Sequence, residues 1–150
     1  MQKFWTSNKP INGLRHFVLV NKTKEKGNMY FLMGSHALND FQLSHLSRQL
    51  GLSSEQTRCL ADARFHYFVH AEQALSATAQ ARLAQVLPDA VIADWSTHAN
   101  TDGCWVLPRE GTLSPWCSKA LDILHHCGLT DVDRVDRAIY YPIDVTGLTD

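Results

Sequence analysis

The sequence predicts one small domain that mixes helices and strands. Short apolar or alternating runs, typical of strands, take turns along the chain with longer stretches of helical periodicity, in the order β-α-β-α-β-α-β. Such alternation favours a parallel α/β sheet, whereas the small number and short length of the strands speak against one. At 150 residues the chain is of ordinary single-domain size and buries about two-thirds of its unfolded surface.

The strands are predicted from short apolar or alternating runs that end at Gly, Pro or polar loops. They are expected at Tyr30–Met33, Phe65–Val69, Cys104–Leu107 and Val135–Tyr141, with a further short strand possible at Val91–Trp95. In the second run, Phe65, Tyr67 and Val69 share one face while the opposite face mixes histidine with phenylalanine. We therefore expect this strand to lie at an edge of the sheet or against a partner.

Three helices are predicted from apolar residues that recur every three or four positions. The first runs from a cap at Asn39 or Asp40 to Gly51, the second from Ser76 to Pro88, and the third from Ser114 to Gly128. A further helical turn can begin at Ser53 or Ser54. The sheet is therefore expected to be covered by about three helices.

The third helix has the clearest start and the most polar surroundings. Ser114 is a good N-cap and Pro115 suits the first helical position, where its missing N–H costs nothing. One face is apolar, formed by Trp116, Ala120, Ile123, Leu124 and Cys127. Thr112, Ser118 and Lys119 lie around the free N–H groups of the first turn. This end of the helix could hold an anion or a partner's carboxylate.

The same stretch resembles a known family. The run G-T-L-S-P-W-C-S-K-A-L-D-I, followed by H-C-G-L and R-A-I-Y-Y, is similar to the N-terminal domain of the large, single-chain phosphoribosylformylglycinamidine synthase. Met29–Phe41 resembles the opening strand and first helix of that family, and Ala63–Ser76 resembles its second strand. Two positions depart from the family pattern: Cys117 replaces a serine, and Glu110 replaces a proline. Because a thiol is the weaker hydrogen-bonding group, any role of that hydroxyl is in doubt.

The resemblance implies a PurS-like α+β fold with a mainly antiparallel small sheet. It also implies purine biosynthesis: the full enzyme is a ligase that uses ATP, Mg²⁺ and glutamine-derived ammonia to amidate formylglycinamide ribonucleotide. The synthase and glutaminase domains of the same enzyme would then be the partners of this chain. We expect the chain to bind no cofactor and to have no catalytic activity alone.

Charge and composition suggest how the chain is divided. The net charge is −1, but residues 1–28 have six basic residues and one acid, which makes this segment +5 and leaves −6 for the rest. We expect residues 1–28 to be a basic extension outside the domain, residues 29–145 to form the domain, and 146–150 to begin a linker. Nothing in the whole-chain charge favours nucleic acid or an anionic membrane. Four cysteines without a C-x-x-C pair, and no secretory signal, favour a cytoplasmic setting.

Metal and nucleophile chemistry is weakly supported. His125, His126 and Cys127 are contiguous, yet neighbouring helical residues point about 100° apart and cannot together bind one ion. Cys117 near a helix N-terminus could be a nucleophile, but the sequence contains neither a G-x-C-x-G elbow nor a glycine-rich phosphate loop. No catalytic and no metal-binding residue is assigned.

Two functions remain open. In the first, the domain docks on the synthase core and helps to shape the substrate cleft and the ammonia path. The candidate cleft or interface residues are then Arg109, Thr112, Ser114, Ser118 and Lys119, supported by the structural residues Trp116, Ile123 and Gly128. In the second, the chain is a stand-alone PurS-like interaction module that binds a protein partner, or another copy of itself, through an edge strand and the Trp116 helix.

Overall fold

The structure is a computed structural model that describes residues 5–6, 17–18, 28–95, 103–108 and 112–143. Two short strands near the start, β1 (Trp5–Thr6) and β2 (Phe17–Val18), pair antiparallel. The expectations for the rest of residues 1–28, except Asn28, and for residues 146–150 lie outside the described residues. The main elements are β3 (Asn28–His36), α1 (Asp40–Gln49), α2 (Ser54–Ala61), β4 (Arg64–Ala71), α3 (Ala77–Val86), β5 (Val91–Ile92), β6 (Cys104–Val106), α5 (Pro115–His126) and β7 (Val132–Tyr141).

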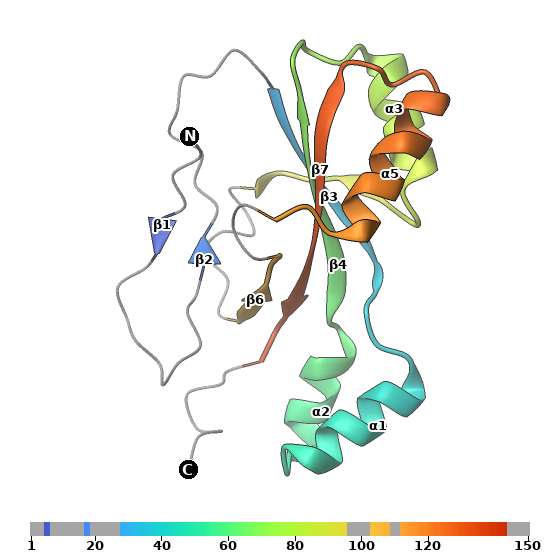
Figure 1. Ribbon diagram of the computed structural model, residues 1–150. Helices are drawn as coiled ribbons and strands as arrows, with labels where there is room; N and C mark the ends of the chain where they lie inside the picture. Colours follow the sequence, from blue (N-terminus) through green and yellow to red (C-terminus); the bar gives the residue numbers. More distant parts are fainter. Residues whose placement is uncertain (1–4, 7–16, 19–27, 96–102, 109–111, 144–150) are drawn as a thin grey trace.

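The main sheet has five strands in the order β5-β3-β4-β7-β6, and every neighbouring pair is antiparallel. Helices α3 and α5 cover one face, while α1 and α2 lie together beyond one end of the sheet (Figure 1). The α+β class and the antiparallel sheet are therefore confirmed. The helical turn expected after Ser53 is a separate helix, α2, so the described residues contain four helices where about three were expected.

The position of β4 corrects one expectation. This strand lies between β3 and β7 in the middle of the sheet, not at an edge. Its mixed face is buried as thoroughly as its apolar face, since His66 is 1% exposed and Phe68 6% exposed. The prediction was wrong because histidine counts as polar in the sequence pattern, whereas the imidazole of His66 is buried among aromatic rings.

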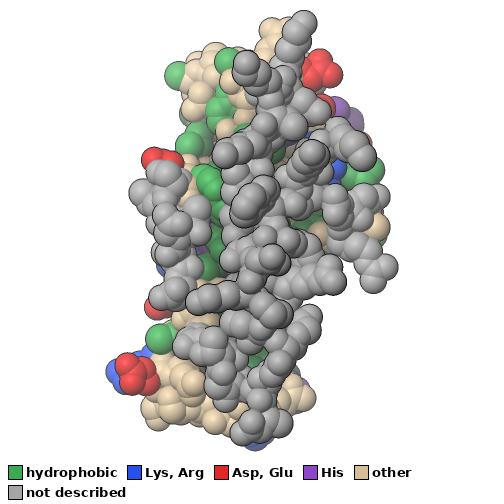
Figure 2. Space-filling model, turned by 90° about the vertical axis from the view of Figure 1, so that its left-hand side faces the viewer, with side chains coloured by type: hydrophobic (Ala, Val, Ile, Leu, Met, Phe, Trp, Pro, Cys, Tyr) green, Lys and Arg blue, Asp and Glu red, His purple; other side chains and the backbone are tan. Residues whose placement is uncertain are grey.

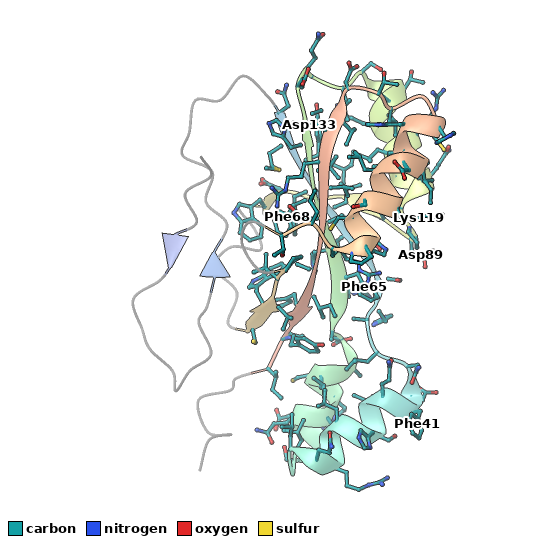
Figure 3. All side chains as sticks on the ribbon, viewed as in Figure 1. Phe41, Phe65, Phe68, Asp89, Lys119 and Asp133 are labelled. Atoms are coloured by element: carbon teal, nitrogen blue, oxygen red, sulfur yellow. The ribbon has the colours of Figure 1, made fainter. Side chains whose placement is uncertain are left out.

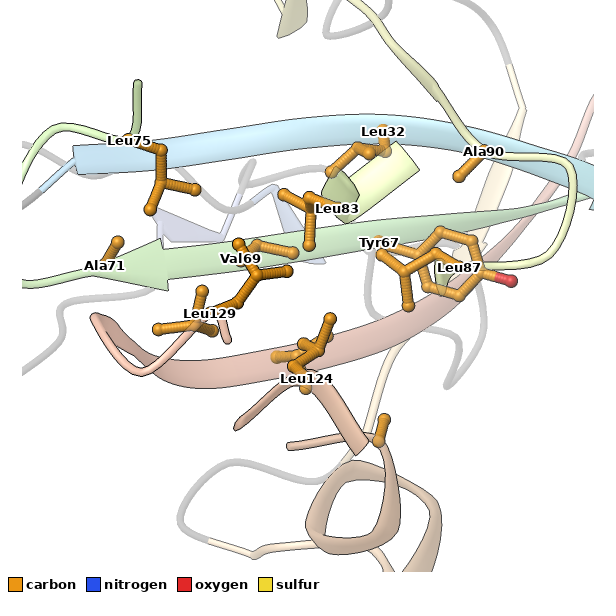
Figure 4. Close-up of a cluster of buried hydrophobic side chains, with 13 residues drawn as sticks. Leu32, Tyr67, Val69, Ala71, Leu75, Leu83, Leu87, Ala90, Leu124 and Leu129 are labelled. Carbon is orange, nitrogen blue, oxygen red and sulfur yellow. The ribbon is translucent and has the colours of Figure 1, made fainter. Parts of the chain in front are cut away.

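The larger core lies between the sheet and the two covering helices. Tyr67 and Val69 from β4 meet Leu83 from α3 and Leu124 from α5, and each of these four side chains is at most 2% exposed (Figure 4). Burying one such side chain contributes about 1.5–3 kcal/mol to folding. The two helices are therefore held to the sheet by side chains of its central strand.

The opposite face of the sheet carries a cluster of aromatic rings. Phe31 and Phe68 from the central strands lie with their ring centroids 5.3 Å apart, and Trp95 and Trp105 pack against them. His66 stacks on Phe31 with its ring at a 5.3 Å centroid distance. Figure 2 views this side of the molecule, where patches of hydrophobic side chains are visible in green. Both faces of β4 therefore contribute to a core.

Helix boundaries follow the sequence signals. Asn39 and Ser53 cap α1 and α2, and each forms a capping box with the glutamine three residues later. Gly128 ends α5 with a φ of +82°, while the N–H of Leu129 bonds to the carbonyl of Leu124, as in a Schellman motif. The structural role expected for Gly128 is thus explained, because glycine adopts a positive φ at little cost.

Two neighbours on α5 provide a test of this packing. Leu124 is fully buried, whereas Ile123 is 45% exposed. Leu124→Ala should lower the free energy of unfolding by about 2–5 kcal/mol, because the surrounding core cannot close the cavity. Ile123→Ala should lower it by less than about 1 kcal/mol. Urea denaturation of the two variants measures both values, and equal losses would contradict this packing.

Candidate functional site

The candidate residues gather at the first turn of α5. Ser114 is the N-cap, and its hydroxyl accepts a hydrogen bond from the backbone N–H of Cys117 at 3.1 Å. Thr112, Ser118 and Lys119 are all exposed around it. Lys119 lies on α5, on the helix side of the sheet (Figure 3). Arg109, the fifth candidate, lies outside the described residues.

Trp116, expected to support the site, packs against the core on the helix-covered face of the sheet. It is half-buried and stacks on Tyr67 from β4, with a 5.6 Å distance between ring centroids and 21° between ring planes. The aromatic side chain that β6 contributes is Trp105, which packs on the opposite face of the sheet. Ile123, expected to support the site from behind, is mostly outside the core and contributes an exposed apolar side chain. The support comes from Trp116, Ala120 and Leu124.

Arg137 completes this stack. Its guanidinium carbon lies 4.5 Å from the ring centroid of Trp116 and 4.6 Å from that of Phe65, so the cation contacts two aromatic rings. Arg137 is also the cross-strand partner of Tyr67 in the pairing of β4 with β7. Burial raises the pKa of the Tyr67 hydroxyl, and the charge of Arg137 partly offsets that rise. We call Phe65, Tyr67, Trp116 and Arg137 the arginine stack.

On its other side, the first turn of α5 is joined to β7 through Cys117. The hydroxyl of Ser114 donates to the Cys117 sulfur at 2.9 Å, and the thiol in turn donates to the Asp136 carboxylate at 3.6 Å. Arg134 pairs with the same carboxylate at 2.6 Å. The thiol of Cys117 is therefore a hydrogen-bond donor to Asp136. It is buried, with 3% of its surface exposed, and faces no open site.

Among the described residues, no three His, Cys, Asp or Glu side chains come together as a metal site would require. His125 and His126 instead contact the backbone carbonyls of Val132 and Asp122. All four cysteines are free, and only Cys59 is exposed. Within the described part of the chain, no helix is long and apolar enough to span a membrane.

Sequence analysis missed Phe65, Asp136 and Arg137 as members of the site. A signal for Arg137 was present, because it interrupts the apolar face that Val135 and Ile139 define in the last strand. A cation on the inward face of a strand is expected to have an aromatic or acidic neighbour, because such a neighbour stabilises its charge away from water. The residues that Arg137 contacts depend on the register in which β4 pairs with β7. That register cannot be predicted from the sequence of either strand alone.

A double-mutant cycle measures how much the contact between Trp116 and Arg137 in the arginine stack contributes to stability. Trp116→Ala and Arg137→Met each remove one member, and the two side chains are in direct contact. The coupling free energy between them should be about 0.5–2 kcal/mol, the range for a cation held against an aromatic ring. Urea unfolding of the single and double variants gives this value. Strict additivity would show that the contact contributes nothing to stability.

A comparison with protein families agrees with this architecture. Residues 64–150, more than half of the chain, match the family model described as formylglycinamide ribonucleotide amidotransferase N-terminal. The match begins at the first residue of β4 and includes α5, β7 and the candidate residues at the start of α5. The chain therefore belongs to the family of N-terminal domains of formylglycinamide ribonucleotide amidotransferase, a synthase of purine biosynthesis.

Proposed function

We propose that this domain docks on the synthase core of the amidotransferase through the start of α5. In this role it helps to shape the cleft for formylglycinamide ribonucleotide and the path of ammonia. The observation that carries the proposal is the contrast between the two sides of this turn. Cys117 and Ala120 anchor it in the core, while Thr112, Ser118 and Lys119 are directed outward.

The polar residues exceed what the helix itself needs. Ser114 alone caps the helix through its bond to the N–H of Cys117. Ser118 and Lys119 add a hydroxyl and a cation next to a helix end that already carries partial positive charge. Such a surface suits an acidic or phosphate-bearing neighbour. A domain interface near a nucleotide substrate would supply one.

The domain would act by position and not by chemistry. The thiol of Cys117 donates to Asp136, and with only 3% of the residue exposed it is poorly placed to attack a substrate. In the proposed role, glutamine hydrolysis and the use of ATP and Mg²⁺ belong to other domains of the enzyme. This chain would bind no cofactor of its own.

The proposal is tested in a full-length enzyme that carries this domain. Lys119→Ala combined with Thr112→Val should lower kcat/KM for formylglycinamide ribonucleotide by about tenfold, corresponding to about 1.4 kcal/mol of lost transition-state stabilisation. Glutaminase activity should be unchanged, because the glutaminase domain has its own site.

Arg58→Ala is the matched control, since Arg58 is an exposed cation on α2, beyond the end of the sheet. It should leave both activities as in the wild type. If the double variant also retains both activities, the polar residues serve the helix only and the proposed function is wrong.

A second function is favoured by one observation, the exposed edge of the sheet at β5. Val91 is 61% exposed and Ile92 40% exposed on this outermost strand. An apolar edge can pair with a strand of a partner or of a second copy. The chain would then be a stand-alone interaction module that associates with itself.

Self-association through β5 makes its own prediction. The 150-residue chain should then sediment as a dimer. Val91→Lys should shift it to a monomer, because a charge on an edge strand opposes pairing. Thr78→Lys on the exposed face of α3 is the control and should leave the dimer intact. A wild-type chain that is monomeric in sedimentation equilibrium at micromolar concentration would exclude it.

A further inference from the structure

We infer that the guanidinium of Arg137 receives a carboxylate from the synthase part of the same enzyme. The inference rests on the proposed function, because it names the chemistry of the partner at the surface where α5 begins. Arg137 would be the central contact of that interface. Lys119 and the apolar side chains nearby would surround it.

The stacking leaves the donors of Arg137 available. The rings of Phe65 and Trp116 both lie against the guanidinium, with centroids 4.6 and 4.5 Å from its carbon. Contacts of this kind use the charge of the cation and not its five N–H donors, which lie in the guanidinium plane. The rings therefore restrict the position of the guanidinium while its donors can still serve a planar acceptor. Two parallel bonds to a carboxylate suit these donors.

The other arginines near this sheet use their donors within the domain. Arg134 pairs with Asp136 at 2.6 Å, and Arg64 contacts His36 at 3.2 Å and the Gly34 carbonyl at 3.4 Å. Among the described residues, no carboxylate lies within ion-pair distance of Arg137, and its contacts are the two rings. A half-buried guanidinium whose contacts are aromatic still has hydrogen-bonding capacity for an acidic partner. An acid from another domain would use that capacity.

The surroundings also resemble the centre of a protein interface. Lys119 and Ile123 follow Trp116 at the third and seventh positions, so they lie on the same side of α5. Lys119 is exposed, Ile123 is 45% exposed, and Leu113, which precedes the helix, is 69% exposed. Arginine and tryptophan are the residue types most enriched where interfaces lose most energy on truncation. Two cations beside a helix N-terminus favour an acidic partner over a basic one.

The test compares hydrogen exchange in the 150-residue chain with that in a full-length enzyme that carries the domain. Backbone amides of residues 112–119 should exchange more slowly in the full-length enzyme. Arg137→Met keeps an unbranched apolar stem against the rings but removes the charge, and it should reduce this added protection by about tenfold or more. Arg137→Lys should have an intermediate effect, because it keeps the charge without the fork. Arg58→Met is the matched control and should behave as the wild type.

A second measurement separates a charge contact from packing. Raising the salt from about 0.05 M to about 0.5 M should weaken the added protection in the wild type and have a smaller effect in Arg137→Met, which keeps only the Lys119 charge at this surface. Exchange of the β3, β4 and β7 amides in the 150-residue chain shows whether each variant is folded. If that sheet is loosened in Arg137→Met, the comparison is made with Arg137→Lys and the salt dependence.

The outcomes distinguish the inference about Arg137 from the proposal that the domain docks on the synthase core. If the wild-type enzyme protects residues 112–119 and folded Arg137→Met protects them equally, the inference about Arg137 is wrong and the docking proposal stands. If the wild-type enzyme gives these residues no added protection, the docking proposal itself is wrong. Protection that depends on Arg137 and on salt supports both.

Discussion

The whole fold depends on burying both faces of β4. One face of this strand presents Tyr67 and Val69 to the helices, and the other presents His66 and Phe68 to an aromatic cluster. A strand with two buried faces requires hydrogen-bonding partners on both sides and a cover on each face. Strands β3 and β7 supply the partners, while α3 and α5 cover one face. The orientation of α5, and with it the candidate site, follows from that cover.

Local signals in the sequence predicted most elements well. The cap at Ser114 and the stop at Gly128 were predicted correctly, and of the alternatives left open the structure selects Asn39 and Ser53. The helix expected from Ser76 is capped by that residue. These signals are reliable because each depends on a few neighbouring residues. The central position of β4 was not predicted, because it depends on the strands that pair with β4 and on the side chains that cover its mixed face. Neither can be inferred from the residues of β4 alone. Ile123 illustrates the same limit: its spacing suits the apolar stripe of α5, but the helix turns that position outward.

The candidate site, too, was predictable from the sequence only in part. The polar residues at the start of α5 were predictable from capping chemistry and from the family resemblance. The arginine stack was not, because it joins residues 65, 67, 116 and 137 from three elements through the register of β4 and β7. Likewise, the sequence shows a cysteine where the family has a serine, and only the structure shows that its thiol reaches Asp136.

The order of the strands along the chain has a consequence for synthesis on the ribosome. Strand β4 pairs with β3, which precedes it, and with β7, which begins only at residue 132. Until that last strand emerges, one edge of an apolar central strand has no partner in the main sheet. Exposed edges of this kind are sites where nascent chains associate wrongly. The nascent domain is therefore most exposed to wrong association in the interval between the emergence of β4 and that of β7.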